Sequence, residues 1–318
     1  MTRIVQIQRT GDASVLELVE VATPSPGPGE VLIRQRAIGL NFVDLYHRTG
    51  MYPVPLPAVL GVEAAGEIIA LGAGVDSLAI GQRVAYAGAL GAYATERTLP
   101  AWRAIAIPPA LQDRDAATPL ARGITAHMLQ HEVYRVDARS TILVHSAAGG
   151  LGNLLVRRAK QLGARVIATV GSEAKAEVAR AAGADHVIVG RDADFPALVL
   201  ALTEQRGVDV AYDGVGGTTL AKNFRCVREF GVVASFGQAA GPIPAIEVSA
   251  LGKRSLSLAR PSVMLYMQDR ERYRAAAAAV IASGITSSPG GAYSLGEVAR
   301  AHAELEAGQT TGAPVLLP

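Results

Sequence analysis

A glycine-rich segment at residues 146–152 is the part of the sequence whose residue types and spacing most clearly indicate chemistry. It reads Ser-Ala-Ala-Gly-Gly-Leu-Gly, follows an apolar stretch at 141–145 and precedes a helix-like stretch at 153–162. A turn of this kind between a strand and a helix is where a dinucleotide binds. An ordinary glycine-rich turn is the alternative, and the further strand and helix patterns downstream favour the dinucleotide site.

Each glycine of this segment has a separate role in such a turn. Gly149 and Gly150 allow the backbone to approach a pyrophosphate, and Gly152 allows the helix to pack closely on the strand. Free N–H groups at the start of the helix then face the phosphates. Ala147 stands where the usual motif begins with glycine. The predicted contacts of this turn are Ala148, Gly149, Gly150, Leu151 and Gly152.

The end of the next predicted strand distinguishes NAD from NADP. An NAD site usually has an acid about 20 residues after the glycines, bonded to the ribose 2′-hydroxyl. That window falls on residues 169–172 and contains no acid before Glu173, whereas Lys175 and Arg191 are nearby cations. A small neutral site flanked by two cations suits a 2′-phosphate, so we predict NADPH (NADP+). The predicted contacts are Gly171, Ser172, Lys175 and Arg191.

Strand and helix patterns alternate from residue 141 to residue 236, which predicts βαβ units and a parallel sheet with both faces covered. The expected strands are Thr141–His145, Arg165–Val170, His186–Val189, Val208–Tyr212 and Gly231–Phe236. The expected helices are Asn153–Leu162, Glu173–Ala182, Phe195–Gln205 and Leu220–Arg228.

The two ends of the chain differ from this middle part. The first third has short strand-like stretches separated by Gly and Pro, which indicates a small, irregular β unit. Beyond Arg260 we expect helices at Leu265–Ala282 and Leu295–Glu306 and a final strand at Val315–Leu317 that returns to the first unit. At 318 residues the chain suits two domains.

Composition excludes several classes of protein. Hydrophobic residues make up 50% of the chain and the net charge is only +2, so we expect neither a long disordered tail nor a nucleic-acid partner. One cysteine, Cys226, cannot form an intrachain disulfide. No apolar stretch approaches the roughly 20 residues of a membrane-spanning helix, and the N-terminus lacks a secretory signal.

Motifs spread over nearly the whole chain resemble the medium-chain dehydrogenase/reductase superfamily, specifically its zinc-free quinone oxidoreductase (zeta-crystallin-like) branch. The motifs, in order, are Ala37–Asp44, Arg48–Pro53, Leu60–Gly66, Gly81–Val84, Gly91–Tyr93, His145–Gly152, Tyr212–Gly216, Ser235–Gly237 and Arg260–Ser262. The resemblance implies an α/β fold in which a Rossmann-type parallel-sheet domain is inserted into a split GroES-like β domain.

The same resemblance implies a domain layout and an assembly. Residues 1–117 and 259–318 form the GroES-like catalytic domain, residues 118–258 form the NADP(H)-binding domain, and the active cleft lies at their junction. A homodimer is expected, joined through an edge strand near Arg254–Leu258. The lone cysteine and the lack of a secretory signal fit a cytoplasmic protein.

The resemblance also bears on metal content. Zinc-dependent members place a cysteine ligand where this chain has Asn41 and a histidine ligand where it has Val62. Catalytic zinc needs about three protein ligands, which Cys226 and Glu63 cannot supply. We therefore expect no metal site, and without a metal to activate an alcohol, reduction of an electron-poor acceptor is the easier reaction.

Further site residues follow from the resemblance alone. It assigns Asn41 and Thr125 to the nicotinamide end of the site, as both catalytic and cofactor-binding residues. Tyr46 and Tyr52 match aromatic positions at the acceptor site of quinone reductases, where either hydroxyl would bond a quinone oxygen; ordinary packing is the alternative for both. The cofactor's nicotinamide half is expected against Gly214, Val215, Phe236 and Gly237.

The predicted function is hydride transfer from NADPH to a quinone. An NADPH-dependent reductase of alkenals or enones is the alternative within enzymes, because quinones and conjugated carbonyl compounds both accept hydride without a metal. A nucleotide-binding protein without useful turnover, such as a crystallin or a sensor, is the alternative outside enzymes.

Overall fold

The computed structural model describes residues 1–287 and 289–318, and it divides into two compact units. Unit 1 comprises Met1–Ile124 and Met264–Pro318, and unit 2 comprises Thr125–Val263. One unit is therefore inserted into the other along the chain, as the sequence predicted. The limits predicted for the domains, at 117/118 and 258/259, stay a prediction.

Unit 2 alternates strands and helices. Its strands are β9 (Thr141–Val144), β10 (Arg165–Val170), β11 (His186–Val189), β12 (Val208–Asp213), β13 (Val227–Ser235) and β14 (Ser257–Ala259). Its helices are α4 (Gly150–Gln161), α5 (Glu173–Ala181), α6 (Phe195–Leu202), α7 (Thr219–Asn223) and α8 (Ser249–Gly252), with a π-helical turn at Leu129–Val133.

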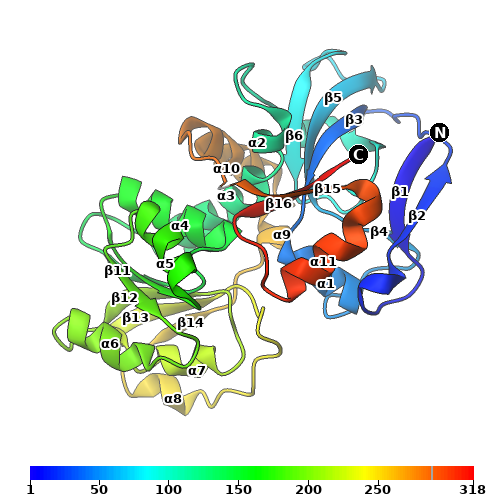
Figure 1. Cartoon of the computed structure of the whole chain (residues 1–318). Coiled ribbons are helices and arrows are strands. Elements are labelled where there is room, and N and C mark those ends of the chain that lie inside the picture. The colour runs from blue at the N-terminus through cyan, green and yellow to red at the C-terminus, as the bar shows by residue number, and fades with distance from the viewer. Residues whose placement is uncertain (288) are drawn as a thin grey trace. The chain divides into compact units, whose positions relative to one another are not determined.

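The six strands of unit 2 form one sheet in the order β11-β10-β9-β12-β13-β14, and every neighbouring pair is parallel. Figure 1 shows α4 and α5 on one face of this sheet and α6, α7 and α8 on the other. Strands covered on both faces are mainly apolar, as in Ile142–Val144, because neither face meets water. The predicted Rossmann-type parallel sheet is confirmed.

Unit 1 is mainly β structure. Its strands are β1 (Thr2–Ile7), β2 (Glu17–Val21), β3 (Glu30–Gly39), β4 (Ala58–Val59), β5 (Glu63–Leu71), β6 (Arg83–Ala87), β7 (Glu96–Pro100), β8 (Ile105–Ala106), β15 (Pro289–Ser294) and β16 (Ala313–Leu317). Its helices are α1 (Phe42–Thr49), α2 (Asp113–Ala116), α3 (Pro119–Met128), α9 (Val263–Tyr266), α10 (Arg270–Ala282) and α11 (Val298–Glu306), where α3 and α9 cross the limits of the unit. Short 3₁₀ turns lie at Ala13–Val15, Ala101–Arg103 and Leu295–Glu297.

Strand β3 organises the larger sheet of unit 1, whose order is β15-β16-β3-β5-β6-β8 with β7 also paired to β3. A smaller sheet has the order β2-β1-β4. The C-terminal strand β16 pairs antiparallel with β3, with Val315 opposite Gly39. The end of the chain therefore completes the sheet that its first third begins, as predicted.

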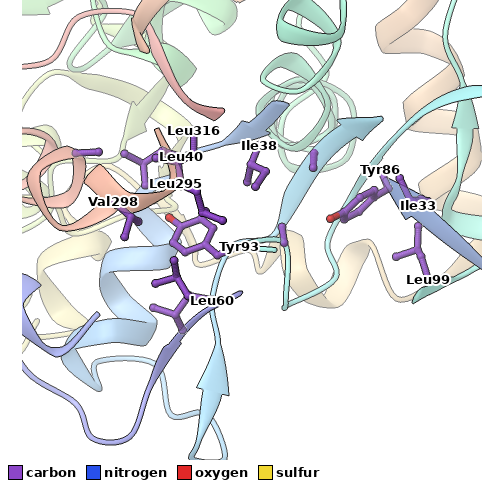
Figure 2. Packing of buried hydrophobic residues seen from close by; sticks show 14 of the residues in the cluster. Ile33, Ile38, Leu40, Leu60, Tyr86, Tyr93, Leu99, Leu295, Val298 and Leu316 are labelled. Atoms are coloured by element: carbon purple, nitrogen blue, oxygen red, sulfur yellow. The ribbon is translucent and has the colours of Figure 1, made fainter. Parts of the chain in front are cut away.

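A continuous apolar core fills unit 1, and Figure 2 shows part of it. Tyr86 and Tyr93 are fully buried among aliphatic side chains such as Ile38 and Leu60. A buried tyrosine hydroxyl needs a hydrogen-bond partner. Tyr93 finds two partners in a polar cluster that borders the candidate site, described below.

Two predicted helices are shorter than expected. The helix predicted at Leu220–Arg228 ends at Asn223, and strand β13 begins at Val227. The chain leaves the helix there because the main-chain oxygen of Cys226 accepts a hydrogen bond from the N–H of Val208 on the neighbouring strand β12. The helix predicted at Leu265–Ala282 is split into α9 and α10. The split lies at Asp269, whose carboxylate accepts hydrogen bonds from the first turn of α10.

None of the helices in the described chain has the length and apolarity that a membrane crossing requires.

Candidate functional site

The glycine-rich turn of unit 2 lies between β9 and α4. Ser146 has a positive φ of 52°, and Gly149 precedes the helix in an extended conformation. A Cβ at Gly152 would lie 2.2 Å from the main-chain oxygen of Ser146, closer than any side chain allows. Glycine is therefore required at Gly152, and Gly149 and Gly150 at the start of the helix remain partly exposed to an approaching group.

The first turn of α4 can hold an anion. Gly149 provides no side-chain cap, and the first turn, which begins at Gly150, has no acidic side chain. The first N–H groups of a helix lack intrahelical partners, and the helix dipole makes this end positive. The turn therefore offers hydrogen-bond donors and a favourable field to a pyrophosphate, which is the fit that a dinucleotide needs.

The end of β10 brings together residues predicted to bind a 2′-phosphate. Ser172 precedes α5 in an extended conformation, and Lys175 lies in the first turn of that helix. A Cβ built on Gly171 would lie 3.5 Å from Nε of Arg191. The cationic side chain therefore lies beside a small exposed glycine, and a phosphate at this point would meet positive charge.

The turns that follow β12 and β13 pack against each other. A Cβ at Gly214 would lie 2.6 Å from the ring of Phe236, and one at Gly237 would lie 2.7 Å from the Gly214 oxygen. Asp213 holds the first turn, because its Oδ1 accepts the N–H groups of Val215 at 2.8 Å and Gly216 at 2.9 Å. The four residues predicted for the nicotinamide half thus lie in two adjacent turns.

Two further side chains of unit 2 make hydrogen bonds in this region, and sequence reasoning gave Arg260 no role in the turns. Arg260 donates from Nη1 to the main-chain oxygens of Ser235 at 3.3 Å and Gly237 at 3.1 Å. His145 is buried, with Nε2 2.8 Å from Oδ1 of Asn223. Burial lowers the pKa of His145, which is a satisfied core residue. The Arg-Pro-Ser motif at 260–262 could have pointed to a role for Arg260 in the sequence analysis.

In unit 1, Asn41 caps the N-terminus of α1 and is held by two carboxylates. Its Nδ2 donates to Oε1 of Glu63 at 2.8 Å. Its main-chain N–H donates to Oδ2 of Asp44 at 2.8 Å, and Asn41 and Asp44 form a capping box. Asn41 therefore also has the local turn role that asparagine commonly takes.

Glu63 is fully buried and has an arginine partner. Its Oε1 accepts from Nη1 of Arg122 at 3.0 Å, and its Oε2 accepts from the N–H of Ala121 at 2.8 Å. Burial raises the pKa of Glu63, and the Arg122 guanidinium opposes that shift. Sequence reasoning missed this pair. Glu63 and Arg122 each stand in an otherwise apolar stretch of the sequence. A charged residue that is buried in such a stretch requires a partner of opposite charge, and this pattern could have indicated the pair.

A second polar cluster begins at Asp44. Tyr93 donates its hydroxyl hydrogen to Oδ2 of Asp44 at 3.0 Å and lies 2.8 Å from Nε2 of His302. The fully buried Arg48 continues the cluster to Glu306 through a 2.7 Å ion pair. Burial raises the pKa of Asp44 to about 7. The cluster joins α1 to α11, two helices far apart in the sequence, which no local pattern predicts.

Tyr46 and Tyr52 lie side by side, and their predicted place at the acceptor site stays a prediction. Their ring centroids are 5.0 Å apart in an edge-to-face arrangement, and the Tyr52 N–H donates to the Tyr46 carbonyl at 3.0 Å. Tyr46 is 9% exposed and Tyr52 is half-buried. Thr125 is buried on α3 and belongs to unit 2, so its predicted place beside Asn41 stays a prediction.

Metal ligands are not gathered anywhere in the part of the chain that the structure describes. No group of three or more His, Cys, Asp or Glu side chains lies close enough to hold a metal ion. Cys226 is buried, and burial raises the pKa of its thiol to about 12, so it is an inert core residue.

Comparison with known proteins is consistent with this geometry. Residues 27–109 match the alcohol dehydrogenase GroES-like domain, and residues 150–282 match the family described as zinc-binding dehydrogenase. A quinone oxidoreductase of Pseudomonas aeruginosa is 38% identical, with all of both chains covered. A 2-haloacrylate reductase of a Burkholderia species is 41% identical over 94% of each chain.

Solved structures extend the comparison to three dimensions. The structure of Escherichia coli quinone oxidoreductase complexed with NADPH matches with a TM-score of 0.95 and 35% identity, and all of both chains is covered. Both the sequence likeness and the structural likeness therefore span the whole chain, including the inserted parallel-sheet unit. The chain belongs to the quinone oxidoreductase branch of the medium-chain dehydrogenase/reductase superfamily.

Proposed function

We propose that this protein is an NADPH-dependent reductase that transfers a hydride to a quinone. The observation that carries the proposal is the full-length similarity to quinone oxidoreductases, one of which is solved as an NADPH complex. The glycine turn at the start of α4 supports the cofactor, because its backbone accommodates a pyrophosphate. The absence of an acid at the end of β10 and the position of Arg191 beside Gly171 support a 2′-phosphate.

The residues of unit 2 would bind and orient the cofactor, which supplies a hydride when bound. The backbone of residues 148–152 would hold the pyrophosphate. Ser172, Lys175 and Arg191 would hold the 2′-phosphate. The paired turns of Gly214 and Phe236 would contact the nicotinamide half. Fixing the reactive ring in this way lowers the entropy cost of the reaction.

Unit 1 would supply the groups that meet the acceptor. Reduction of a quinone to a quinol consumes one hydride and one proton, and negative charge develops on the quinone oxygen as hydride arrives. A hydroxyl of Tyr46 or Tyr52 would donate a hydrogen bond to that oxygen. No buried catalytic acid is required, because water can protonate the released quinol.

An acceptor panel tests the proposal. NADPH oxidation would be followed with benzoquinones, naphthoquinones, alkenals and enones, with NADH as the alternative donor. We expect quinone-dependent oxidation that is faster with NADPH than with NADH. Oxidation with enones but not quinones would replace the proposed substrate class. Binding of NADPH without turnover on any acceptor would favour a nucleotide-binding protein without enzymatic function.

Reduction of a conjugated carbonyl compound is the second candidate. The similarity to a 2-haloacrylate reductase, at 41% identity, favours it specifically. A haloacrylate is an activated alkene, which accepts hydride on carbon, so a deuteride from labelled NADPH would be retained in the product. A quinone that accepts hydride on oxygen loses the label to water. Product deuterium content therefore separates the two chemistries.

Assembly is a further proposal. Strand β14 (Ser257–Ala259) is an edge of the parallel sheet, and we expect a homodimer to form along it. Light scattering of the parent protein and of a Leu258→Lys variant tests this, since a charged side chain on the edge opposes strand pairing.

A further inference from the structure

A row of polar side chains crosses the edge of the unit 2 sheet at which its parallel strands end. Thr169 lies near the end of β10, His145 follows β9 directly, and Asp213 is the last residue of β12. These three strands are neighbours in the sheet, and Asn223 at the end of α7 completes the row. His145, Asp213 and Asn223 are buried, so each requires hydrogen-bond partners within the protein.

The partners of the Asn223 amide fix its orientation. Nδ2 lies 3.1 Å from Oδ2 of Asp213 and 3.1 Å from the main-chain oxygen of Thr219, and both of these atoms are acceptors. The reverse orientation would place the amide oxygen against a carboxylate oxygen, with no hydrogen between them. Oδ1 of Asn223 therefore faces His145, whose Nε2 lies 2.8 Å away. Because an amide oxygen only accepts, Nε2 of His145 carries a hydrogen.

This orientation also fixes the tautomer of His145. Burial lowers the pKa of His145, against the charge of Asp213 and the hydrogen bond to Asn223, and thus favours the neutral ring. A neutral imidazole has one N–H group, so Nδ1 is an acceptor. It takes the hydroxyl hydrogen of Thr169 at 2.8 Å. The hydrogen bonds therefore all run in one direction, from Thr169 through His145 and Asn223 to Asp213.

The carboxylate at the end of this row holds the turn after β12. Oδ2 of Asp213 accepts from Asn223, while Oδ1 accepts from the N–H groups of Val215 at 2.8 Å and Gly216 at 2.9 Å. Rotation of the carboxylate would break these bonds together. Gly216 also has a positive φ of 68°, so the turn has an unusual backbone conformation that needs support. The conformation of the turn therefore depends on the position of the Asp213 carboxylate.

We propose that His145, as its Nε2–H tautomer, and Asn223 are positioning residues that hold Asp213, and through it the turn at residues 214–216, in the conformation that binds the dinucleotide. This inference rests on the proposed function, because it takes that turn as part of the NADPH site. It gives neither His145 nor Asn223 a contact with the ligand. All of its residues belong to unit 2.

The first test is spectroscopic and needs no ligand. Nitrogen-15 labelling of the histidines in the full chain reports which ring nitrogen carries the hydrogen, and the signal that disappears in His145→Gln belongs to His145. At neutral pH we expect a protonated Nε2 and an unprotonated Nδ1. A hydrogen on Nδ1, in a neutral ring or a cation, would overturn the inference.

The second test exchanges the amide and the carboxylate. Asn223→Asp places a carboxylate oxygen against Asp213, and the dissociation constant for NADPH, measured by fluorescence without an acceptor, is expected to rise about tenfold, as for one lost hydrogen bond. The double variant Asn223→Asp/Asp213→Asn restores the pair and conserves the total charge. It still offers an oxygen to His145 and an oxygen to the turn, so we expect it to recover most of the NADPH affinity.

The third test removes the donor of the histidine. His145→Ala is expected to weaken NADPH binding by about tenfold, whereas His145→Gln keeps an N–H group for Asn223 and should bind within about threefold of the parent. His186→Gln is the matched control, because His186 is a half-buried histidine of the same sheet, on β11, with Arg165 as its partner. Equal losses in His145→Ala and His145→Gln would contradict a role for the donor.

A shortened ligand separates a local effect on the turn from a general loss of structure. Adenosine 2′,5′-bisphosphate lacks the nicotinamide half of NADPH, so Asn223→Asp should bind it as the parent does. Equal weakening of both ligands would show a purely structural role and overturn the inference, as would recovery of thermal stability without NADPH affinity in the double variant. If Asn223→Asp does not fold, the double variant and the tautomer still decide. If the parent binds NADPH but reduces no acceptor, the proposed function fails, while the affinities still support or overturn the role of His145 and Asn223.

Discussion

Replacing Asp44 by asparagine is expected to change how stability depends on pH. Asp44 is fully buried, and its Oδ1 has no hydrogen-bond partner in the described structure. Burial, followed by the nearby charge of Glu63, raises its pKa from 3.8 to about 7, against the hydrogen bonds from Asn41 and Tyr93. The folded protein therefore binds this proton more tightly than the unfolded chain does.

The sign and size of the effect follow from this difference. The stabilisation by the bound proton is fully present below pH 3.8 and is lost as the pH rises through about 7. At about 1.4 kcal/mol per pH unit, the whole change is roughly 4 kcal/mol. Between about pH 5 and 8, the unfolding free energy of the parent should fall relative to that of Asp44→Asn by roughly 3 kcal/mol.

Denaturant unfolding at several pH values measures this difference. The single tryptophan, Trp102, packs on Tyr273 in the same unit as Asp44, so its fluorescence reports on the relevant unit. Asp12→Asn is the control, since the pKa of the exposed Asp12 is lowered and it stays charged over this range. A parent-minus-variant difference that does not change with pH would refute the assignment of the raised pKa to Asp44.

Three further predictions concern other parts of the chain. Burial lowers the pKa of His302 from 6.5 to about 3, so the stability that its neutral ring contributes is lost as the pH falls below 6.5. His302→Gln should therefore make the unfolding free energy depend less on pH in the acid range. Gly152→Ala should weaken NADPH binding by at least tenfold in a folded protein, as circular dichroism would confirm, whereas Gly252→Ala, where a Cβ meets open space, should bind normally. Lys175→Ala and Arg191→Ala should each raise the KM for NADPH several-fold and leave that for NADH unchanged; equal effects on both cofactors would contradict the 2′-phosphate assignment.

Local sequence patterns were sufficient to predict the positions of the glycine turns that we propose bind the nucleotide. Glycines at fixed spacing between a strand and a helix identify a site because their role is set by the backbone of a few consecutive residues. The turn at Gly152 and the pairing of Gly171 with Arg191 both depend on neighbouring βα units of one sheet. The sequence therefore predicted these residues together with the parallel fold that positions them.

Residues whose role depends on a distant partner were not predictable in the same way. Glu63 meets Arg122 across 59 positions, and Tyr93 meets His302 across 209. A buried charged residue implies that a partner of opposite charge exists, but the sequence alone does not identify that partner. For the same reason, the limit of the helix after Leu220 was wrong, because pairing of β12 with β13 outweighs helical propensity there.

Anaerobic oxidation of NADPH by p-benzoquinone tests the central claim most directly. The account predicts that the protein catalyses this reaction, that one quinol forms for each NADPH consumed, and that NADH is the poorer donor. Absence of catalysis with this and other quinones, in a protein that binds NADPH, would contradict the claim.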